Sequence, residues 1–307
     1  MIDILLATYN GQAHLAEQID SLLAQEFVAW RLLARDDGSK DGTVELLEAY
    51  AGRLKGRMTL LPNSGGNLGP MGNFLELMRH SDADHIMLCD QDDVWLPGKI
   101  GMTLAKMREM ESEQGRDKPL LVHTDFRVVD EHLNILAESG WRYQKTDPDR
   151  DSLNRLLVQN VATGCTVMIN RALRDLALPV PGEALMHDHW LALAAASFGK
   201  IGYLPTPTLL YRQHGGNEVG AQPWGMASIL GHLSDLPAVR KVIASNRAQA
   251  WAFCQRYQGL LPERERGMLE SFVHLPQRGP LQRRIDIFRQ GFFYSGAMRN
   301  LGWLFLC

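Results

Sequence analysis

Cysteine is scarce in this sequence, with 4 among 307 residues, and no two of them form a CxxC pair. Such isolated cysteines argue against a zinc site or a disulfide framework and suit free thiols in a reducing cytosol. Long apolar runs are also absent, since no stretch reaches the roughly 18 residues that a bilayer-spanning helix needs. The first residues carry Asp3 and no basic segment, so we expect no signal peptide. These absences favour a cytoplasmic location.

A surplus of positive charge is absent too. The formal net charge is −3 and the pI is near 6.4, whereas nucleic-acid-binding domains usually carry a basic excess. The glycine-rich segment Asn63–Gly72 matches neither GxGxxG nor the P-loop pattern. It also follows the third expected strand rather than the first. A dehydrogenase or a P-loop NTPase is therefore disfavoured, although this loop still lets backbone N–H groups approach a ligand.

Apolar runs and helical patterns alternate regularly in the first part of the chain. The expected strands are Ile2–Ala7, Arg31–Arg35, Met58–Leu61, His85–Cys89 and Leu120–Asp125. The expected helices are Ala13–Gln25, Thr43–Tyr50, Asn73–Arg79 and Pro97–Glu113. Strands that alternate with helices predict an α/β fold with a mostly parallel central sheet and flanking helices on both of its faces.

The rest of the chain has fewer strand signals. Its expected elements are strands at Thr163–Ile169 and Thr208–Tyr211 and helices at His187–Ala196, Asp235–Gly259 and Pro262–Phe272. We therefore expect a domain of residues 1–219 that carries the sheet, followed by a helical region of residues 220–307.

Polar clusters follow three of the expected strands. They are Thr8–Asn10, Asp36–Ser39 and Asp90–Asp93. Because parallel sheets place ligands beyond the carboxyl ends of their strands, the three clusters predict one shared crevice.

The segment Asp90–Asp93 holds three carboxylates in four residues. At such spacing they repel one another unless a cation compensates. Hard oxygen ligands suit Mg²⁺ or Mn²⁺, both of which bridge to diphosphate oxygens. The alternative is a solvated turn in which Asp93 caps the segment before Pro97.

Two further segments have both a functional and a plain structural interpretation. Asp36–Thr43 is a turn by composition, yet a carboxylate there could accept hydrogen bonds from a nucleobase or a ribose. Tyr9 could stack on a nucleobase or simply pack.

Asp188 lies in the first turn of an expected helix, where the helix dipole favours an acid. It could equally be the general base that takes a proton from an acceptor hydroxyl, and His187 with Asp188 could be a metal-binding or structural pair.

Arg212 and His214 follow a short expected strand. Both could reach diphosphate oxygens and stabilise the charge that develops on a leaving group. His214 could instead ligate the metal. The structural alternative is a basic loop past the end of the sheet.

Taken in order, these segments resemble the family 2 glycosyltransferases of the GT-A fold. The segments that carry the resemblance are Ala7–Gly11, Asp36–Ser39 with Asp41–Thr43, Asn67–Gly69, Asp90–Trp95, Thr163–Cys165, His187–Trp190 and Tyr211–His214. The forms Asp-Gln-Asp-Asp and Arg-Gln-His are most similar to the bacterial branch with rhamnosyltransferases of cell-surface polysaccharides.

The resemblance implies a Rossmann-like GT-A catalytic domain over residues 1–219 and an inverting, single-displacement transfer from a dTDP- or UDP-sugar, with dTDP-rhamnose as the leading donor. Asp188 would be the catalytic base, Asp92 the main metal ligand and His214 a second one. The donor-binding residues would be Thr8, Tyr9, Asn10, Asp36, Asp37, Asn67, Asp90, Gln91 and Arg212. The acceptor side would hold Trp95, Gly164, His189 and Trp190. Relatives often have two aromatic residues after the Asp, whereas His189 takes the first of these positions here.

The C-terminal tail is basic and aromatic. From Pro276 onward it contains five arginines and a single acid, Asp286, among many apolar residues. Such helices suit a lipid interface, so we expect peripheral association with the inner face of the cytoplasmic membrane and a glycan or lipid-linked acceptor. The alternative is a helix that packs on the protein's own core or on a second copy in a homodimer.

Two other classes of function compete with a transferase. A nucleotidyltransferase on a similar sheet would usually carry a phosphate-binding loop where Thr8–Gly11 stands. A non-catalytic nucleotide-sugar- or carbohydrate-binding protein need not retain both Asp92 and Asp188.

Overall fold

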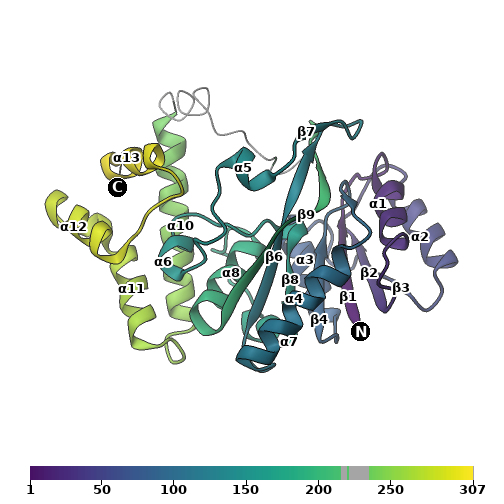
Figure 1. Ribbon diagram of the computed structural model, residues 1–307, viewed down its shortest axis with the longest axis horizontal. Helices are drawn as coiled ribbons and strands as arrows, with labels where there is room; N and C mark the ends of the chain where they lie inside the picture. Colours follow the sequence, from purple (N-terminus) through teal and green to yellow (C-terminus); the bar gives the residue numbers. More distant parts are fainter. Residues whose placement is uncertain (216–219, 221–234, 307) are drawn as a thin grey trace.

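The computed structural model describes residues 1–215, 220 and 235–306 (Figure 1). Its strands are β1 (Ile2–Thr8), β2 (Trp30–Asp36), β3 (Met58–Leu61), β4 (His85–Cys89), β5 (Val94–Trp95), β6 (Leu120–Val129), β7 (Ile135–Ala137), β8 (Met168–Asn170) and β9 (Lys200–Arg212). All of them belong to one sheet.

The helices that flank the sheet come from the first two-thirds of the chain. They are α1 (Leu15–Leu23), α2 (Thr43–Arg53), α3 (Gly69–His80), α4 (Lys99–Gln114), α5 (Gly140–Gln144), α6 (Leu153–Leu156), α7 (Arg171–Ala177) and α8 (His187–Phe198). The C-terminal helices are α10 (Leu236–Arg256), α11 (Glu263–Val273), α12 (Pro280–Gln290) and α13 (Ala297–Leu306). None of the helices within the described residues is both long enough and apolar enough to cross a membrane.

The strand order is β3-β2-β1-β4-β8-β6-β9-β5, with β7 paired to β6. Strands β1, β2, β3, β4, β6 and β9 run in one direction, and the short strands β5, β7 and β8 run against them. The expected α/β fold with a mostly parallel sheet is therefore confirmed. The carboxyl ends of the parallel strands meet at one edge of the sheet.

The sequence of β1 shows why helices cover both faces of the sheet. Ile4 and Leu6 belong to one buried cluster, which α1, α2 and α4 complete, whereas Leu5 belongs to a second cluster with residues of α3 and α8. Since side chains alternate between the faces of a strand, an uninterrupted apolar run needs a cover on each side. The backbone of β1 is thus fixed in the interior.

Two of the expected strands differ most in their bounds from those in the structure. The strand expected at Thr163–Ile169 is shorter, because Gly164–Thr166 forms a 3-10 turn in which Thr166 donates its backbone N–H to the Thr163 carbonyl at 2.9 Å. Conversely, β9 begins eight residues before the expected Thr208, at Lys200. Its two prolines disguise it, and the register against β6 shifts between Leu204 and Pro207. An irregular pairing accommodates residues that lack an N–H.

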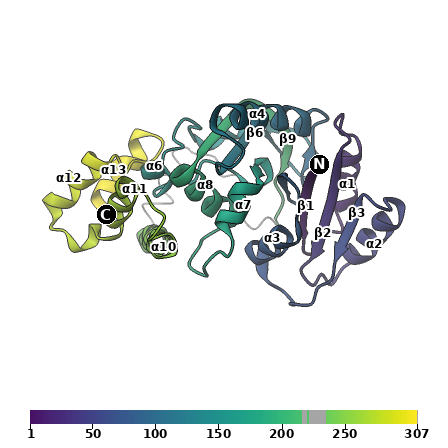
Figure 2. The same cartoon turned by 90° about the horizontal axis from the view of Figure 1, so that it is seen from below.

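The C-terminal helices lie at the end of the molecule farthest from β2, β3 and α2 (Figures 1 and 2). Helix α10 packs against α8, where the ring of Phe253 lies 5.0 Å from that of Trp190 and 4.6 Å from that of Tyr257. These side chains belong to the same buried cluster as Leu5 of the sheet. The described part of the C-terminal region is helical, as expected, and shares a hydrophobic core with the sheet.

Candidate active site

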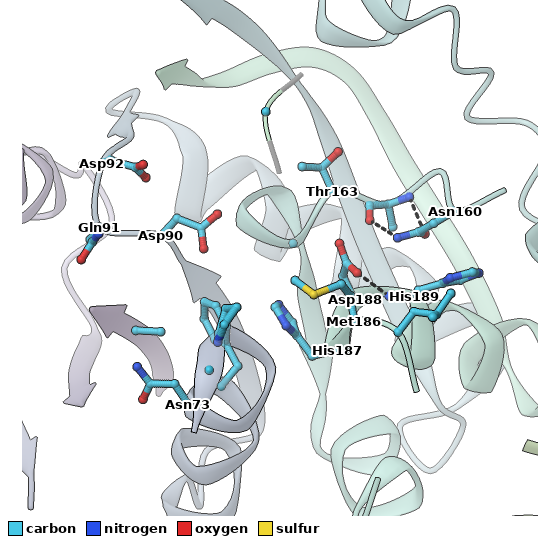
Figure 3. A pocket seen from close by; sticks show the side chains of 18 of the residues that line it. Asn73, Asp90, Gln91, Asp92, Asn160, Thr163, Met186, His187, Asp188 and His189 are labelled. Atoms are coloured by element: carbon cyan, nitrogen blue, oxygen red, sulfur yellow. Dashed lines mark hydrogen bonds between the residues drawn. The ribbon is translucent and has the colours of Figure 1, made fainter. Parts of the chain in front are cut away.

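A cleft of about 630 Å³ opens at the carboxyl edge of the parallel strands. Its walls come from the ends of β1, β2 and β4, the start of α8 and the 3-10 turn at Gly164. Asp90 and Asp188 lie on opposite walls with their carboxylates directed into the space between them (Figure 3). The three polar clusters of the sequence therefore do share one crevice.

Most of the predicted site residues line this cleft. They are Thr8, Tyr9, Asp37, Asn67, Asp90, Gln91, Asp92, Gly164, Asp188 and His189. The predicted residues that are not part of its lining are Asn10, Asp36, Trp95, Trp190, Arg212 and His214.

Asp36 builds the turn after β2 and does not face the cleft. Its carboxylate accepts hydrogen bonds from the Thr8 hydroxyl at 3.0 Å and from the backbone N–H groups of Gly38 and Ser39 at 2.9 and 2.8 Å. Asn10 joins the same turn to β1, because it accepts from the Lys40 N–H at 2.9 Å. These groups hold the two loops together.

Gln91 fixes the backbone of Tyr9. Its side-chain oxygen accepts from the Tyr9 N–H at 2.8 Å and its amide donates to the Tyr9 carbonyl at 2.9 Å. The ring of Tyr9 is 46% exposed. This leaves an aromatic face at the cleft available for stacking on a planar ligand.

Asp37 holds the glycine-rich loop that carries Asn67. Its carboxylate accepts the N–H groups of Leu68 and Gly69, both at 2.8 Å, and pairs with the buried guanidinium of Arg35 at 2.8 Å. Gly69 has a φ of 72°, which favours glycine. The loop is therefore shaped by one buried charge pair at the edge of the cleft.

The acidic cluster after β4 lies in a poorly hydrated environment. Burial, reinforced by the charges of Asp92 and Asp188, raises the pKa of Asp90 to about 7. Burial and the neighbouring Asp92 and Asp90 also raise the pKa of Asp93, and one oxygen of Asp93 has no hydrogen-bond partner among the described residues. Ligand atoms of Asp90, Asp93 and Cys165 lie within 4.8 Å of one another. These are the conditions under which a divalent cation compensates a carboxylate cluster.

Lys99 is a buried basic residue whose charge acts on this cluster. Its side chain is completely buried, and it donates to the Thr208 hydroxyl at 3.2 Å. Burial lowers the pKa of Lys99 to about 8, although the neighbouring acidic groups oppose this shift. This partly neutralised ammonium offsets only part of the negative charge.

Asp92 and His214 form a pair at the mouth of the cleft. The Asp92 carboxylate lies 2.8 Å from Nε2 of His214, and the ring of His14 lies 4.9 Å from the ring of His214. Both predicted metal ligands are thus adjacent. His14 was not predicted, since a histidine at the start of a helix carries no signal of a site in the sequence.

Arg212 is buried in the wall behind Asp92. Its Nε donates to the Asp92 carbonyl at 2.8 Å, one terminal nitrogen donates to the Glu131 carbonyl at 2.7 Å, and the other pairs with Glu17. These contacts position the backbone of Asp92. The side chain therefore supports the acidic cluster from behind and does not project into the cleft.

Asp188 is the carboxylate on the opposite wall. Burial raises its pKa to about 6, while hydrogen bonding to backbone groups opposes that shift. One such bond comes from the His189 N–H at 2.6 Å. A Cβ atom at position 164 would lie 3.1 Å from Nε2 of His187, a tighter contact than usual, and in ordinary contact with Asp188. A carboxylate with a pKa near neutrality suits a general base.

The two tryptophans predicted on the acceptor side lie elsewhere. Trp95 is 2% exposed and packs beneath Lys99, and Trp190 is fully buried, with its indole N–H donating to the Ala177 carbonyl at 3.3 Å. Trp190 points away from Asp188 because a helix presents successive residues to different faces. Both are corrected to core residues.

Several lining residues were not predicted. They include Asn73, Phe74 and Asn160. Thr163 and His187 also line the cleft, and both lie in segments that the sequence had singled out. Asn73 donates to the carbonyls of Thr8 and Arg35, and His187 is buried against the ring of Phe74. These residues lie far apart in the sequence, so only the folded chain brings them together.

The sequence profile described as Glycosyl transferase family 2 matches residues 3–176, more than half of the chain. The chain belongs to this family and is a glycosyltransferase that uses a nucleotide sugar. Among curated proteins it is similar to dTDP-rhamnosyl transferase RfbG of Shigella flexneri, with 25% identity over 70% of this chain and 74% of the relative.

Solved structures agree on the fold. The TarS 1-349 structure from S. aureus, in complex with UDP-GlcNAc, matches with a TM-score of 0.57 at 15% identity, over 95% of this chain and 92% of that one. The mannosyltransferase PcManGT of Pyrobaculum calidifontis, in complex with GDP-Man and Mn²⁺, matches with a TM-score of 0.57 at 12% identity, over 99% and 78%. The fold is GT-A, as the sequence resemblance implied.

The buried pair of Arg35 with Asp37 generates a stability prediction. Replacing Asp37→Ala leaves the buried guanidinium of Arg35 without its charge partner and frees two loop N–H groups. We expect a loss of about 3–5 kcal/mol in the free energy of unfolding, measured by urea denaturation. The matched control is Glu138→Ala, which removes the exposed pair with Arg127 and should cost about 0–1 kcal/mol. Equal losses in the two variants would contradict the role given to Asp37.

Proposed function

We propose that this chain is an inverting, metal-dependent transferase that moves a sugar from a nucleotide donor to a hydroxyl of a glycan or lipid-linked acceptor. The observation that supports this most directly is the placement of Asp188 across the cleft from the acidic cluster, close enough for its charge to raise the pKa of Asp90. A diphosphate at one wall and a base at the other leave the space between them for the transferred sugar.

The two walls divide the chemistry. At the acidic wall, Asp90, Asp92 and His214 would hold Mg²⁺ or Mn²⁺, which when bound neutralises the diphosphate as it leaves. At the opposite wall, Asp188 takes the proton of the acceptor hydroxyl as that oxygen attacks the anomeric carbon from the side away from the diphosphate. The attacking oxygen forms one bond while the bond to phosphate breaks, so no enzyme nucleophile is needed.

The donor nucleotide would lie along the ends of β1 and β2. Tyr9 offers its exposed ring to the base, and Asp37 and Asn67 lie on the same wall. RfbG is described as a dTDP-rhamnosyl transferase, which makes dTDP-rhamnose our leading donor; a UDP-sugar is the second choice. The acceptor would enter beside Gly164 and His189. The product would belong to cell-surface polysaccharide of the O-antigen or lipopolysaccharide type.

The C-terminal helices carry two exposed apolar rows. The row on α12 is Leu281, Ile285 and Phe288, and the row on α13 is Met298, Leu301 and Phe305; each side chain is at least 48% exposed. The opposite faces of the same helices are buried through Ile287 and Trp303. The helices thus pack on the protein's core and keep a second apolar face outward.

The positive charge of the C-terminal segment favours one kind of partner for these apolar rows. Five arginines and one acid lie between residue 276 and the end of the sequence, a pattern that suits an anionic lipid surface. We therefore propose that the rows rest on the inner face of the cytoplasmic membrane, where a lipid-linked acceptor would be held.

Asp188 generates a prediction on pH and on mutation. Because only the carboxylate form can accept a proton, kcat should fall as the pH drops through about 6, the pKa of Asp188. The variant Asp188→Asn should keep its donor affinity and lose roughly 10²- to 10⁴-fold in kcat. Transfer assays and calorimetric donor titrations measure these effects, with Asp175→Asn, an exposed aspartate, as control. Near-normal turnover of Asp188→Asn would exclude this residue as the base.

The acidic cluster generates a prediction on metal. Adding dTDP or UDP should raise the thermal unfolding temperature when Mn²⁺ or Mg²⁺ is present and should not raise it in EDTA. A ligand that binds the folded state stabilises that state. Asp92→Ala should abolish this metal-dependent shift, whereas Asp117→Ala, in an exposed loop, should retain it. A nucleotide shift of equal size with and without metal in the unaltered protein would count against the metal site.

The apolar rows generate a prediction on lipid binding. Leu281→Gln, Ile285→Gln and Phe288→Gln combined should reduce co-sedimentation with vesicles of phosphatidylglycerol and phosphatidylethanolamine without changing transfer to a soluble acceptor. The control carries glutamine at Val28, Ile135 and Leu136, which are equally exposed apolar residues outside the rows. Unchanged vesicle binding, or a dimer that the triple variant dissociates, would overturn the membrane assignment in favour of no partner or a second copy.

A further inference from the structure

Helix α10 reaches the catalytic wall through one buried amide. Gln249 is 1% exposed. Its side-chain oxygen accepts the backbone N–H of Leu185 at 2.8 Å, and its side-chain N–H group donates to Nδ1 of His189 at 3.1 Å. The two partners stand on either side of Asp188 in the sequence. One side chain of the C-terminal region therefore holds both ends of the segment that carries the proposed base.

The hydrogen bonds around His189 define its proton. Nε2 lies 2.7 Å from the Leu156 carbonyl, which can only accept, so Nε2 carries the hydrogen. Burial lowers the pKa of His189 and so favours the neutral ring. Nδ1 is then an acceptor, which requires a donor opposite, and the amide nitrogen of Gln249 is that donor. With its nitrogen facing His189, the side-chain amide of Gln249 directs its oxygen to the backbone N–H of Leu185.

The link to the base is the backbone of His189. Its N–H donates to the carboxylate of Asp188 at 2.6 Å, and this bond opposes the rise in the pKa of Asp188. The position of that N–H depends on how α8 begins. The side chain of Met186, at the N-cap position, makes no capping hydrogen bond. The contacts of Gln249 instead hold Leu185 before the helix start and the ring of His189 after it.

We propose that Gln249 is a positioning residue for Asp188, so that α10 of the C-terminal region completes the catalytic site. The inference rests on the proposed role of Asp188 as base. Gln249 touches no reacting atom; it holds Leu185 and His189, and through them the hydrogen bond that His189 gives to the base. Positioning matters because a small misplacement of a catalytic group costs much of its effect.

The test is Gln249→Met, which keeps the length and most of the volume of the side chain and removes both hydrogen bonds. We expect kcat to fall roughly tenfold to a hundredfold with little change in donor affinity. The acid limb of the pH profile should move to higher pH, because a weaker hydrogen bond from His189 no longer opposes the raised pKa of Asp188.

A matched control lies one turn earlier on the same helix. Asn246 is 7% exposed and donates to the Val158 carbonyl at 3.1 Å. Asn246→Leu removes a comparably buried hydrogen bond without touching Leu185 or His189. It should lower the stability to a similar extent and leave the acid limb in place. An acid limb that moves equally in both variants, or in neither, would overturn the positioning role.

A second measurement does not depend on activity. In protein labelled with ¹⁵N-histidine, the resonances of His189, identified by their loss in His189→Gln, should show a hydrogen on Nε2 and none on Nδ1. A hydrogen on Nδ1 would mean that the side-chain oxygen of Gln249 faces His189, so that this oxygen could not accept from Leu185. That result would refute the positioning role of Gln249. If the tautomer is as stated and no donor supports transfer, the proposed function has failed, whereas the hydrogen bonds of Gln249 to Leu185 and His189 are supported.

Discussion

The repulsion among carboxylates in the cleft is the constraint on which the site depends. Asp90, Asp92 and Asp93 follow one strand, and Asp188 faces them from α8. The fold fixes the backbone that carries the acidic cluster. Strand β4 lies between β1 and β8, and the side chain of Arg212 donates a hydrogen bond to the Asp92 carbonyl. Folding energy from the core thus maintains a charge arrangement that is unfavourable without a cation. Such an arrangement is what a diphosphate with its metal can relieve.

The sheet half of the fold was predictable because burial on both faces leaves a simple trace in the sequence. Strands β1, β3 and β4 are mostly apolar, and their bounds agree with those expected to within a residue. Strand β9 was mostly missed, since Pro205 and Pro207 interrupt its apolar pattern, and the irregular pairing with β6 that tolerates them is a tertiary feature.

The residues that line the cleft were predictable only where they follow a strand or begin a helix. Asp90 and Asp188 each stand at the boundary of a regular element, and the ends of parallel strands converge by geometry. Trp190 was misplaced because its nearness to Asp188 in the sequence does not put it on the same helix face. Nothing in the sequence singles out Lys99, His14 or Gln249, because each acts through contacts to residues far away in the chain. Their roles exist only in the folded state.

The C-terminal region links the two halves of the proposed function. Its helix α10 shares the core of the sheet through Phe253 and contacts the residues on either side of Asp188 through Gln249. Helices α12 and α13 keep apolar rows outward at the far end. A helix tied to the interior by both packing and hydrogen bonds cannot shift without disturbing the segment that carries Asp188. If the outward rows rest on a lipid surface, the region that locates the enzyme at its acceptor also holds Asp188, the proposed base.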